Sequence, residues 1–370
     1  MIVLSDLPSV EAGLKTLKNS DYKLFTQIDQ MLNVLDSVAQ EPCVVLDRGD
    51  ECTILPIIHL IKKLRGELPL YVLSQRKDSI SFVTDLLKAK VDDLFFFKEE
   101  DEIIPLLQQI AKGVQHNISK NVAFVGSGTG ATFSLLNTAA IMKKLYPNLK
   151  IGIVDCDYYK DDVLLRLDTQ NRKPLTINDL LIDSIEEKTC NSESLLSFNQ
   201  IADMLVVPSG GQSYYHSDSL GREDQYLKLL TMISMQNDIT FFNIGASLND
   251  FSTSALRLVD KTCILVTQEP VPIQVLLNLS SLFKELSPSK DVELIINRYR
   301  KENKTVTSEM IESVFGQHAS IKIPDFPAIA LKSELERKPL DLFSGGDLAR
   351  SLKELAEKIV LDLVIPKGVL

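Results

Sequence analysis

The sequence predicts two α/β domains, each built around a mostly parallel sheet. Short apolar runs alternate along the chain with segments of helical periodicity. Strands that alternate with helices in this way favour parallel sheets covered on both faces. A polar segment at residues 115–120 separates a helical pattern from a new strand, so we place the domain boundary there, with domains at residues 1–115 and 121–370.

The predicted strands are short, and most of them are strongly apolar. In the first domain they are IVLS, CVVLD, LYVLS and DLFFF; in the second they are NVAFVG, KIGIVD, DMLVVP, ITFFNIG, CILVT and VELIIN. Amphipathic segments such as PIIHLIKKLRGEL and VLLNLSSLFKEL lie between them and predict the covering helices.

Composition limits the classes of function. The chain has 370 residues, enough for two or three domains of roughly 150 residues. The net charge of −10 argues against a general nucleic-acid-binding surface, because phosphate binding needs basic residues. Five scattered cysteines without a C-x-x-C pair indicate reduced thiols and a cytoplasmic protein. We expect no signal peptide, no membrane-spanning helix and no metal cluster of histidines.

The first domain places polar residues where strands end. Its strand–helix units suit a flavodoxin-like doubly wound fold, in which functional groups gather at the carboxyl ends of the strands. Asp6, Asp47 and Ser74 end the first, third and fourth strands, and Lys98 follows the fifth. Clustered carboxylates there can hold a cation that lets one of them attack a phosphoryl donor.

These positions resemble those of a response-regulator receiver domain. The resemblance implies a magnesium-binding acid at Asp6, a phospho-acceptor at Asp47, and the accompanying hydroxyl and lysine at Ser74 and Lys98. Two departures weaken the chemistry: Ser5 replaces one acid of the usual pair, and the lysine comes one position late. A shift of one residue on a strand turns a side chain to the opposite face. We therefore interpret the domain as a receiver-shaped docking domain.

The second domain opens with VAFVGSGTGAT, residues 122–132, followed by the helical run SLLNTAAIMKKL. This order of strand, glycine turn and helix is typical of a phosphate-binding loop. A working P-loop carries a lysine before its Ser or Thr, and Ala131 stands at that place.

From residue 121 onward the sequence resembles the ParA/MinD-type ATPases, and within them the TadZ/CpaE pilus-assembly group, which carries an atypical receiver domain in front. Five segments carry the resemblance: VGSGTGATFSLLNTA, VDCDYYKDDV, FFNIGASLNDFSTSALRLVDKTCILVTQEP, LIINRY and IPDFPAIALKSELERKPL. The resemblance implies a flavodoxin-like receiver domain followed by a ParA/MinD-like P-loop domain.

The resemblance also implies a nucleotide site, whose cofactors are either ATP and magnesium or, if the loop has lost nucleotide binding, none. The expected nucleotide-binding residues are Gly126, Ser127, Gly128, Thr129, Gly130, Ala131, Thr132, Phe133, Asn297 and Arg298, and Thr132 is the candidate magnesium ligand. Relatives have an early signature lysine where Gly126 stands, and a Walker B acid where Asn243 stands. Asp155 either orients a water or a metal ion or is simply a strand-end carboxylate; Asn297 and Arg298 either lie near an adenine or cap a strand.

Without both lysines and the Walker B acid, most of the charge neutralisation that phosphoryl transfer requires is missing. Asp155 and Asn243 are therefore interpreted as vestigial, and no catalytic residue is expected. The leading hypothesis is a cytoplasmic, non-catalytic scaffold that dimerises and helps assemble a Flp/Tad-type pilus or a type II/IV secretion machine at the membrane or cell pole. Its expected partners are the secretion ATPase and membrane-associated assembly proteins. The alternatives are a slow ATPase that switches a dimer, and a phospho-dependent signalling adaptor.

Two further segments allow more than one interpretation. Residues 208–224 form a polar, glycine-rich stretch that is either a partner loop or a solvated connection. The last helical pattern, DLARSLKELAEKIVLDLV, has an apolar stripe, but its polar face mixes acids with lysines. A lipid-binding helix needs a basic polar face, so we expect this helix to pack on the sheet.

Overall fold

The structure is a computed structural model. It describes residues 1–5, 7–16, 22–35, 41–47, 54–65, 68–75, 82, 85–86, 89, 91–97, 99–111, 119–126, 128–157, 162–168, 174–185, 199–201, 203–209, 223–245, 249–286, 291–339 and 346–363. The chain divides into two compact units, Met1–Ile118 and Ser119–Leu370.

The first unit is a five-stranded parallel sheet in the order β2-β1-β3-β4-β5. Its strands are β1 (Ile2–Leu4), β2 (Lys23–Phe25), β3 (Cys43–Asp47), β4 (Leu70–Ser74) and β5 (Asp93–Phe96). Its helices are α1 (Pro8–Thr16), α2 (Ile28–Leu35), α3 (Ile54–Leu64), the short 3-10 turn η1 (Glu100–Glu102) and α5 (Ile103–Ala111). This strand order is the flavodoxin-like one, so the predicted fold of the N-terminal domain is confirmed.

The second unit is an eight-stranded sheet in the order β13-β12-β11-β6-β10-β7-β9-β8. Every neighbouring pair is parallel except β8 with β9 at one edge. The strands are β6 (Lys120–Val125), β7 (Ile151–Asp155), β8 (Gln200–Ile201), β9 (Met204–Val207), β10 (Ile239–Ile244), β11 (Lys261–Val266), β12 (Asp291–Tyr299) and β13 (Ile321–Pro324). The expected mostly parallel sheet is confirmed.

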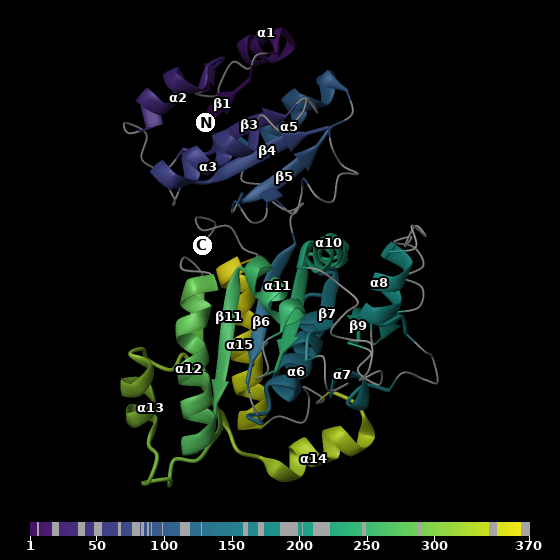
Figure 1. Ribbon diagram of the computed structural model, residues 1–370, viewed down its shortest axis with the longest axis vertical. Coiled ribbons are helices and arrows are strands. Elements are labelled where there is room, and N and C mark those ends of the chain that lie inside the picture. The colour runs from purple at the N-terminus through teal and green to yellow at the C-terminus, as the bar shows by residue number, and fades with distance from the viewer. Residues whose placement is uncertain are drawn as a thin grey trace. The chain divides into compact units, whose positions relative to one another are not determined.

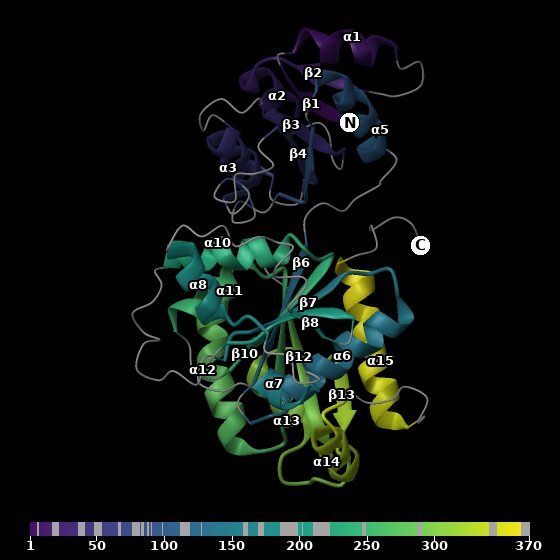
Figure 2. The same cartoon turned by 90° about the vertical axis from the view of Figure 1, so that its right-hand side faces the viewer.

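Helices cover both faces of this sheet. Helices α6 and α15 lie on one face, and α10, α11 and α12 lie on the other (Figures 1 and 2). The helices are α6 (Ala131–Leu145), α7 (Asp162–Leu165), α8 (Ile177–Ile185), α10 (Glu223–Ser234), α11 (Asp250–Leu258), α12 (Pro270–Leu286), α13 (Ser308–Phe315), α14 (Pro327–Glu336) and α15 (Asp347–Leu363).

The strand order predicts where a ligand would bind, at the carboxyl end of β6. Strand β6 lies between β10 and β11, and its helix α6 leads to β7 on the far side of β10. Chain connections therefore diverge at the carboxyl end of β6. In open α/β sheets, ligands bind in the crevice at such a switch point.

The last helix packs as its apolar stripe predicts. Leu348, Leu352, Leu355 and Ile359 of α15 are buried in the core that α6 and the sheet share, and Leu363 packs partly against it. The expectation that this helix covers the sheet is confirmed. Across the described parts of the chain, no helix has both the length and the apolar character needed to cross a bilayer.

Candidate functional site

A glycine turn joins β6 to α6. Gly128 and Gly130 have φ angles of +65° and +81°, a region that glycine adopts without steric cost. Gly126 has a different constraint, because a Cβ atom there would lie 2.1 Å from Thr129 Oγ1. The space that a side chain at position 126 would need is therefore filled by Thr129. Ser127 lies outside the described residues.

The turn is fastened to β12. Asn297 Nδ2 donates a 2.6 Å hydrogen bond to the carbonyl oxygen of Thr129, and Asn297 is buried. A Cβ atom on Gly130 would lie 2.7 Å from the same Nδ2 atom. Asn297 thus holds the conformation of the turn from β12, which lies two strands away from β6 in the sheet, and so does more than cap its own strand end.

Three side chains form a hydrogen-bonded row below the start of α6. Thr132 Oγ1 donates to Asn243 Oδ1 at 3.2 Å, and Asn243 Nδ2 donates to Asp155 Oδ1 at 2.8 Å. The row exists because Asn243 on β10 is in register with Asp155 on β7. An amide can bridge a hydroxyl and a carboxylate because it offers both an acceptor and a donor.

Asp155 is fully buried and organises the chain that follows it. Its carboxylate also accepts from the backbone N–H groups of Asp157 at 3.2 Å and Val163 at 3.3 Å. Burial raises the pKa of Asp155 well above its usual range, although the hydrogen bond from Asn243 and the two backbone bonds oppose the shift. These contacts favour the structural interpretation of Asp155 over a role in orienting a solvent-exposed ligand.

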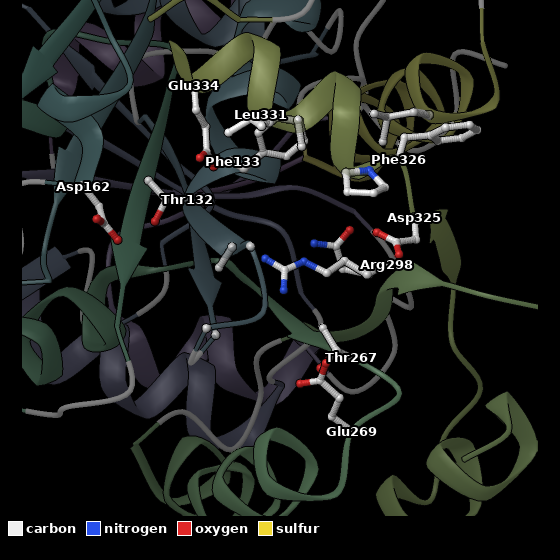
Figure 3. Close-up of a pocket in the computed structure, with 18 of the residues that line it drawn as sticks. Thr132, Phe133, Asp162, Thr267, Glu269, Arg298, Asp325, Phe326, Leu331 and Glu334 are labelled. Carbon is white, nitrogen blue, oxygen red and sulfur yellow. The ribbon is translucent and has the colours of Figure 1, made fainter. Parts of the chain in front are cut away.

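A pocket of about 630 Å³ opens beside the turn (Figure 3). This volume lies within the range of small-molecule sites. One wall comprises the turn and the start of α6, another the ends of β10, β11 and β12, and a third the segment leading into α14. The residues that line the pocket include Gly126, Gly128, Gly130, Ala131, Thr132, Phe133, Asp157, Asp162, Arg166, Asn243, Thr267, Glu269, Asn297, Arg298, Arg300, Asp325, Phe326, Leu331 and Glu334.

Charge in this pocket is only partly neutralised. Arg166 pairs with Glu334, and Arg300 Nε donates to Asp325 at 2.6 Å. For Arg298 the described part of the chain shows no ion pair with a carboxylate. Its side chain extends across the pocket, and its Nη2 atom is 4.0 Å from the position of a Cβ atom on Gly130 (Figure 3).

The glycine turn suits phosphate oxygens, whereas Thr132 is poorly placed as a magnesium ligand. Turn backbone and the helix start can face phosphate oxygens, and Phe326 and Leu331 add apolar surface to the lining. For a metal, the candidate ligand Thr132 already donates to Asn243, and neither residue carries charge. Mg²⁺ is usually held through one or two carboxylates together with substrate phosphates, and Asp155 is occupied by three donors.

In the first unit the structure brings two of the four predicted residues together. Ser74 Oγ donates to Asp47 Oδ2 at 2.7 Å, and both side chains are buried. Asp6 and Lys98 lie outside the described residues. The 208–224 stretch also lies largely outside the described residues, since only 208, 209, 223 and 224 are described.

Comparisons with known proteins concern the fold. No protein-family model matches the sequence, and the curated proteins contain no match. Among solved structures, a ParA family ATPase from Chlorobium tepidum is similar, with 20% identity over 65% of this chain and 99% of that chain and a TM-score of 0.56. The second unit has the ParA/MinD-type ATPase fold.

Other proteins of the ParA/MinD type show the same similarity. The septum site-determining protein MinD of Pyrococcus horikoshii, solved with Mg-ADP, is 17% identical over 68% of this chain and 100% of that chain, with a TM-score of 0.55. The MinC:MinD cell division protein complex of Aquifex aeolicus gives 17% identity, 68% and 99% coverage, and a TM-score of 0.53. The parallel α/β unit in front is additional to this ParA/MinD-type fold.

Several pocket residues were not predicted from the sequence. Thr267 directly follows β11, next to β6, so its position at a strand end was a usable signal. Arg166 and Glu334 are 168 positions apart, and their ion pair joins the end of α7 to α14 where both residues line the pocket. No spacing in the sequence indicates that pair, because it depends on how the ParA/MinD-type fold brings α14 beside α7.

Proposed function

We propose that this protein is a non-catalytic scaffold that retains a nucleotide pocket and helps to assemble a Flp/Tad-type pilus or a related type II/IV secretion machine. Support for the pocket comes from the ParA/MinD-type fold and from the glycine turn held by Asn297. Support for the assembly role comes from the five segments that resemble the TadZ/CpaE group and from the receiver-like unit in front.

The proposal that the protein is non-catalytic rests on one observation. The row Thr132–Asn243–Asp155 replaces the charged metal site of an active ATPase with a hydroxyl, an amide and a buried carboxylate bonded to one another. Ala131 and Gly126 supply no cation to the loop. Phosphoryl transfer depends on positioning and on neutralising charge at the transferred group, so this pocket holds phosphates without activating them.

Steady-state phosphate release tests this directly. The purified chain, with ATP and magnesium, is expected to release phosphate no faster than a buffer blank. The matched variant is Thr132→Ala, which removes the one side-chain hydroxyl at the metal position. Release by the unmodified chain that disappears in Thr132→Ala would instead establish the slow ATPase.

For assembly we propose a homodimer that does not depend on nucleotide. A signature lysine that reaches a partner's phosphates is absent at Gly126, so contacts between protein surfaces must hold the two copies together. A stable interface should bury more than about 1,000 Å². Light scattering at micromolar concentration should give the same dimer mass with and without ATP and magnesium; a monomer that dimerises only on ATP addition would favour the nucleotide switch.

The proposed partners are a secretion ATPase and membrane-associated assembly proteins, which would bring this cytoplasmic protein to the inner face of the membrane or a cell pole. Genes for a secretion ATPase and a prepilin beside the gene for this chain would support the assignment. Co-purification of this chain with that ATPase would test it, with the isolated first unit compared against the full chain to locate the contact.

A further inference from the structure

Arg298 has an unusual backbone conformation at the pocket. It follows Asn297 near the end of β12 with a φ angle of +51°. The left-handed region is unfavourable for residues with a Cβ atom and is rarely occupied without a reason. Such strain concentrates at sites where a side chain must be aimed. At this position the strain directs a long cationic side chain across the turn.

The Arg298 guanidinium lies over the start of α6. Its Nη2 atom is 4.0 Å from the Cβ position of Gly130, and Gly130 is the N-cap of this 15-residue helix. The N-cap offers no side-chain acceptor to the helix. A helix start carries partial positive charge, so a guanidinium placed against it is electrostatically unfavourable unless an anion lies between the two.

Two other features of the pocket point to the same ligand. Thr267 is almost fully buried and lines the pocket, and among the described residues its Oγ1 atom has no hydrogen-bond partner. Arg166 and Arg300, the other cations that line it, are each paired with an acid. Within the described parts of the chain, the Arg298 guanidinium therefore has no carboxylate partner and the Thr267 hydroxyl has no acceptor.

We propose that Arg298 binds the phosphates of the nucleotide and supplies, from β12, the positive charge that the loop lacks. This inference rests on the proposed nucleotide pocket. The ligand class is a nucleoside di- or triphosphate whose phosphates lie between the α6 start and the guanidinium. A planar guanidinium suits this task because it can donate two parallel hydrogen bonds to phosphate oxygens.

The experiment compares three probes by calorimetry: ADP, adenosine and inorganic pyrophosphate. The unmodified chain is expected to bind ADP and pyrophosphate competitively. Arg298→Gln should weaken both by about tenfold or more, the usual effect of losing a hydrogen bond to a charged group. Lys301→Gln is the matched control. Lys301 lies three positions after Arg298 and does not line the pocket, and its substitution removes an equal charge.

A second variant separates binding from structure. Arg298→Gly removes the guanidinium and also relieves the positive φ angle, so its melting temperature should equal or exceed that of the unmodified chain. Weak ADP binding in a chain that is no less stable cannot be explained by a merely structural arginine.

Each outcome decides one claim. If ADP binds equally well to the unmodified chain and to Arg298→Gln, the inference is wrong and the nucleotide pocket stands. If Arg298→Gln weakens the binding of adenosine but leaves the affinity for pyrophosphate unchanged, Arg298 contacts the base and the inference is again wrong. If the unmodified chain binds none of the three probes, the nucleotide pocket itself is refuted and this inference falls with it.

Discussion

Asn243 and Asp155 form a buried amide–carboxylate pair, with 2.8 Å between Nδ2 and Oδ1, at the point where β10 and β7 run in register. The amide orientation is fixed by its second partner, since Asn243 Oδ1 accepts from Thr132. The pair therefore holds three elements together: α6, β10 and β7. A carboxylate at position 243 would break this arrangement, because it has no hydrogen to donate to Asp155.

Asn243→Asp, which restores the acid of active relatives, is expected to destabilise the protein by about 2 kcal/mol at neutral pH. Two carboxylates would face each other in a buried site, and one would have to hold a proton. Denaturant unfolding measures the loss. ATP hydrolysis should stay at the blank, because neither loop lysine returns with this change.

The double variant Asn243→Asp with Asp155→Asn is the matched control. It rebuilds an amide–carboxylate pair in the reverse direction and should recover part of the lost stability. The amide introduced by Asp155→Asn can accept from only one of the backbone N–H groups of Asp157 and Val163, which bond to different oxygens of Asp155. A double variant less stable than the single one by more than the cost of one such bond, about 1 kcal/mol, would mean that the pair is not the cause.

The stability of Asn243→Asp should also depend on pH in a defined direction. Burial already raises the pKa of Asp155, and a second carboxylate raises it further. The folded chain then holds a proton that the unfolded chain releases above about pH 4. The deficit against the unmodified protein should therefore grow as the pH rises from about 4 and shrink below it. Unfolding curves at pH 4 and pH 7 check this sign.

Much of the fold was accessible from sequence because its strands are apolar runs of four or more residues. The runs CVVLD, ITFFNIG and VELIIN all form strands at the predicted places, β3, β10 and β12. Strands β2 and β8 span only three and two residues, too few for a periodicity to stand out. Strand β13 contains Lys322 between apolar residues, and its edge position allows that side chain to reach solvent.

The candidate site was only partly accessible from sequence. The glycine turn and Asn297 were both expected in a nucleotide site, which stays a prediction; the bond from Asn297 to the turn itself was not predicted. The direct bond between Asn243 and Asp155 was not predicted, because it depends on strand order: β10 inserts between β6 and β7. The vestigial interpretation of these two residues concerns activity and stays a prediction.

Gly130→Ala should destabilise the protein clearly more than Gly128→Ala. Both positions have positive φ, which costs a residue with a Cβ atom about 1–2 kcal/mol. Only at Gly130 would the new methyl group also meet Asn297, at 2.7 Å; around Gly128 the space is open. The difference between the two variants in thermal or denaturant unfolding isolates the Asn297 contact. Equal losses would mean that the turn can move away from β12 without cost.

Asp47 is expected to resist phosphorylation by small phosphodonors such as acetyl phosphate. Its carboxylate is about 1% exposed and accepts a hydrogen bond from Ser74. A phosphodonor must reach an ionised oxygen through a bound metal, and Ser5 replaces one of the acids that would hold that metal. Intact-protein mass spectrometry measures the result. A gain of one phosphoryl group that is absent in Asp47→Asn would show that the receiver-like unit is active.

At the opposite end of the second sheet, Lys261 forms a buried ion cluster. Its Nζ atom lies 2.6 Å from Asp291, 2.7 Å from Glu293 and 2.7 Å from Asp362, and its side chain is 1% exposed. Lys358 of α15 also pairs with Glu293. Burial alone would lower the pKa of Lys261, but the three carboxylates raise it above its usual value. The cluster fastens α15 to β11 and β12.

Lys261→Met should cost about 3–5 kcal/mol in the free energy of unfolding near neutral pH, because it leaves Glu293 buried with only part of its compensation. Burial raises the pKa of Glu293, but its ion pairs with Lys261 and Lys358 leave it below the usual 4.5. The stabilisation from that lowered pKa is therefore present above about pH 4.5 and is lost as the pH falls through the folded value.

The loss in free energy of unfolding caused by Lys261→Met should accordingly be full at pH 7. It should be smaller at pH 3.5, where protonation of Glu293 removes the uncompensated charge. Lys332→Met is the matched control, since its pair with Glu336 is exposed and such pairs contribute less than about 1 kcal/mol. Denaturant unfolding of the three proteins at both pH values gives the comparison. A Lys261→Met variant as stable as the control at pH 7 would mean that α15 is held by its apolar stripe alone.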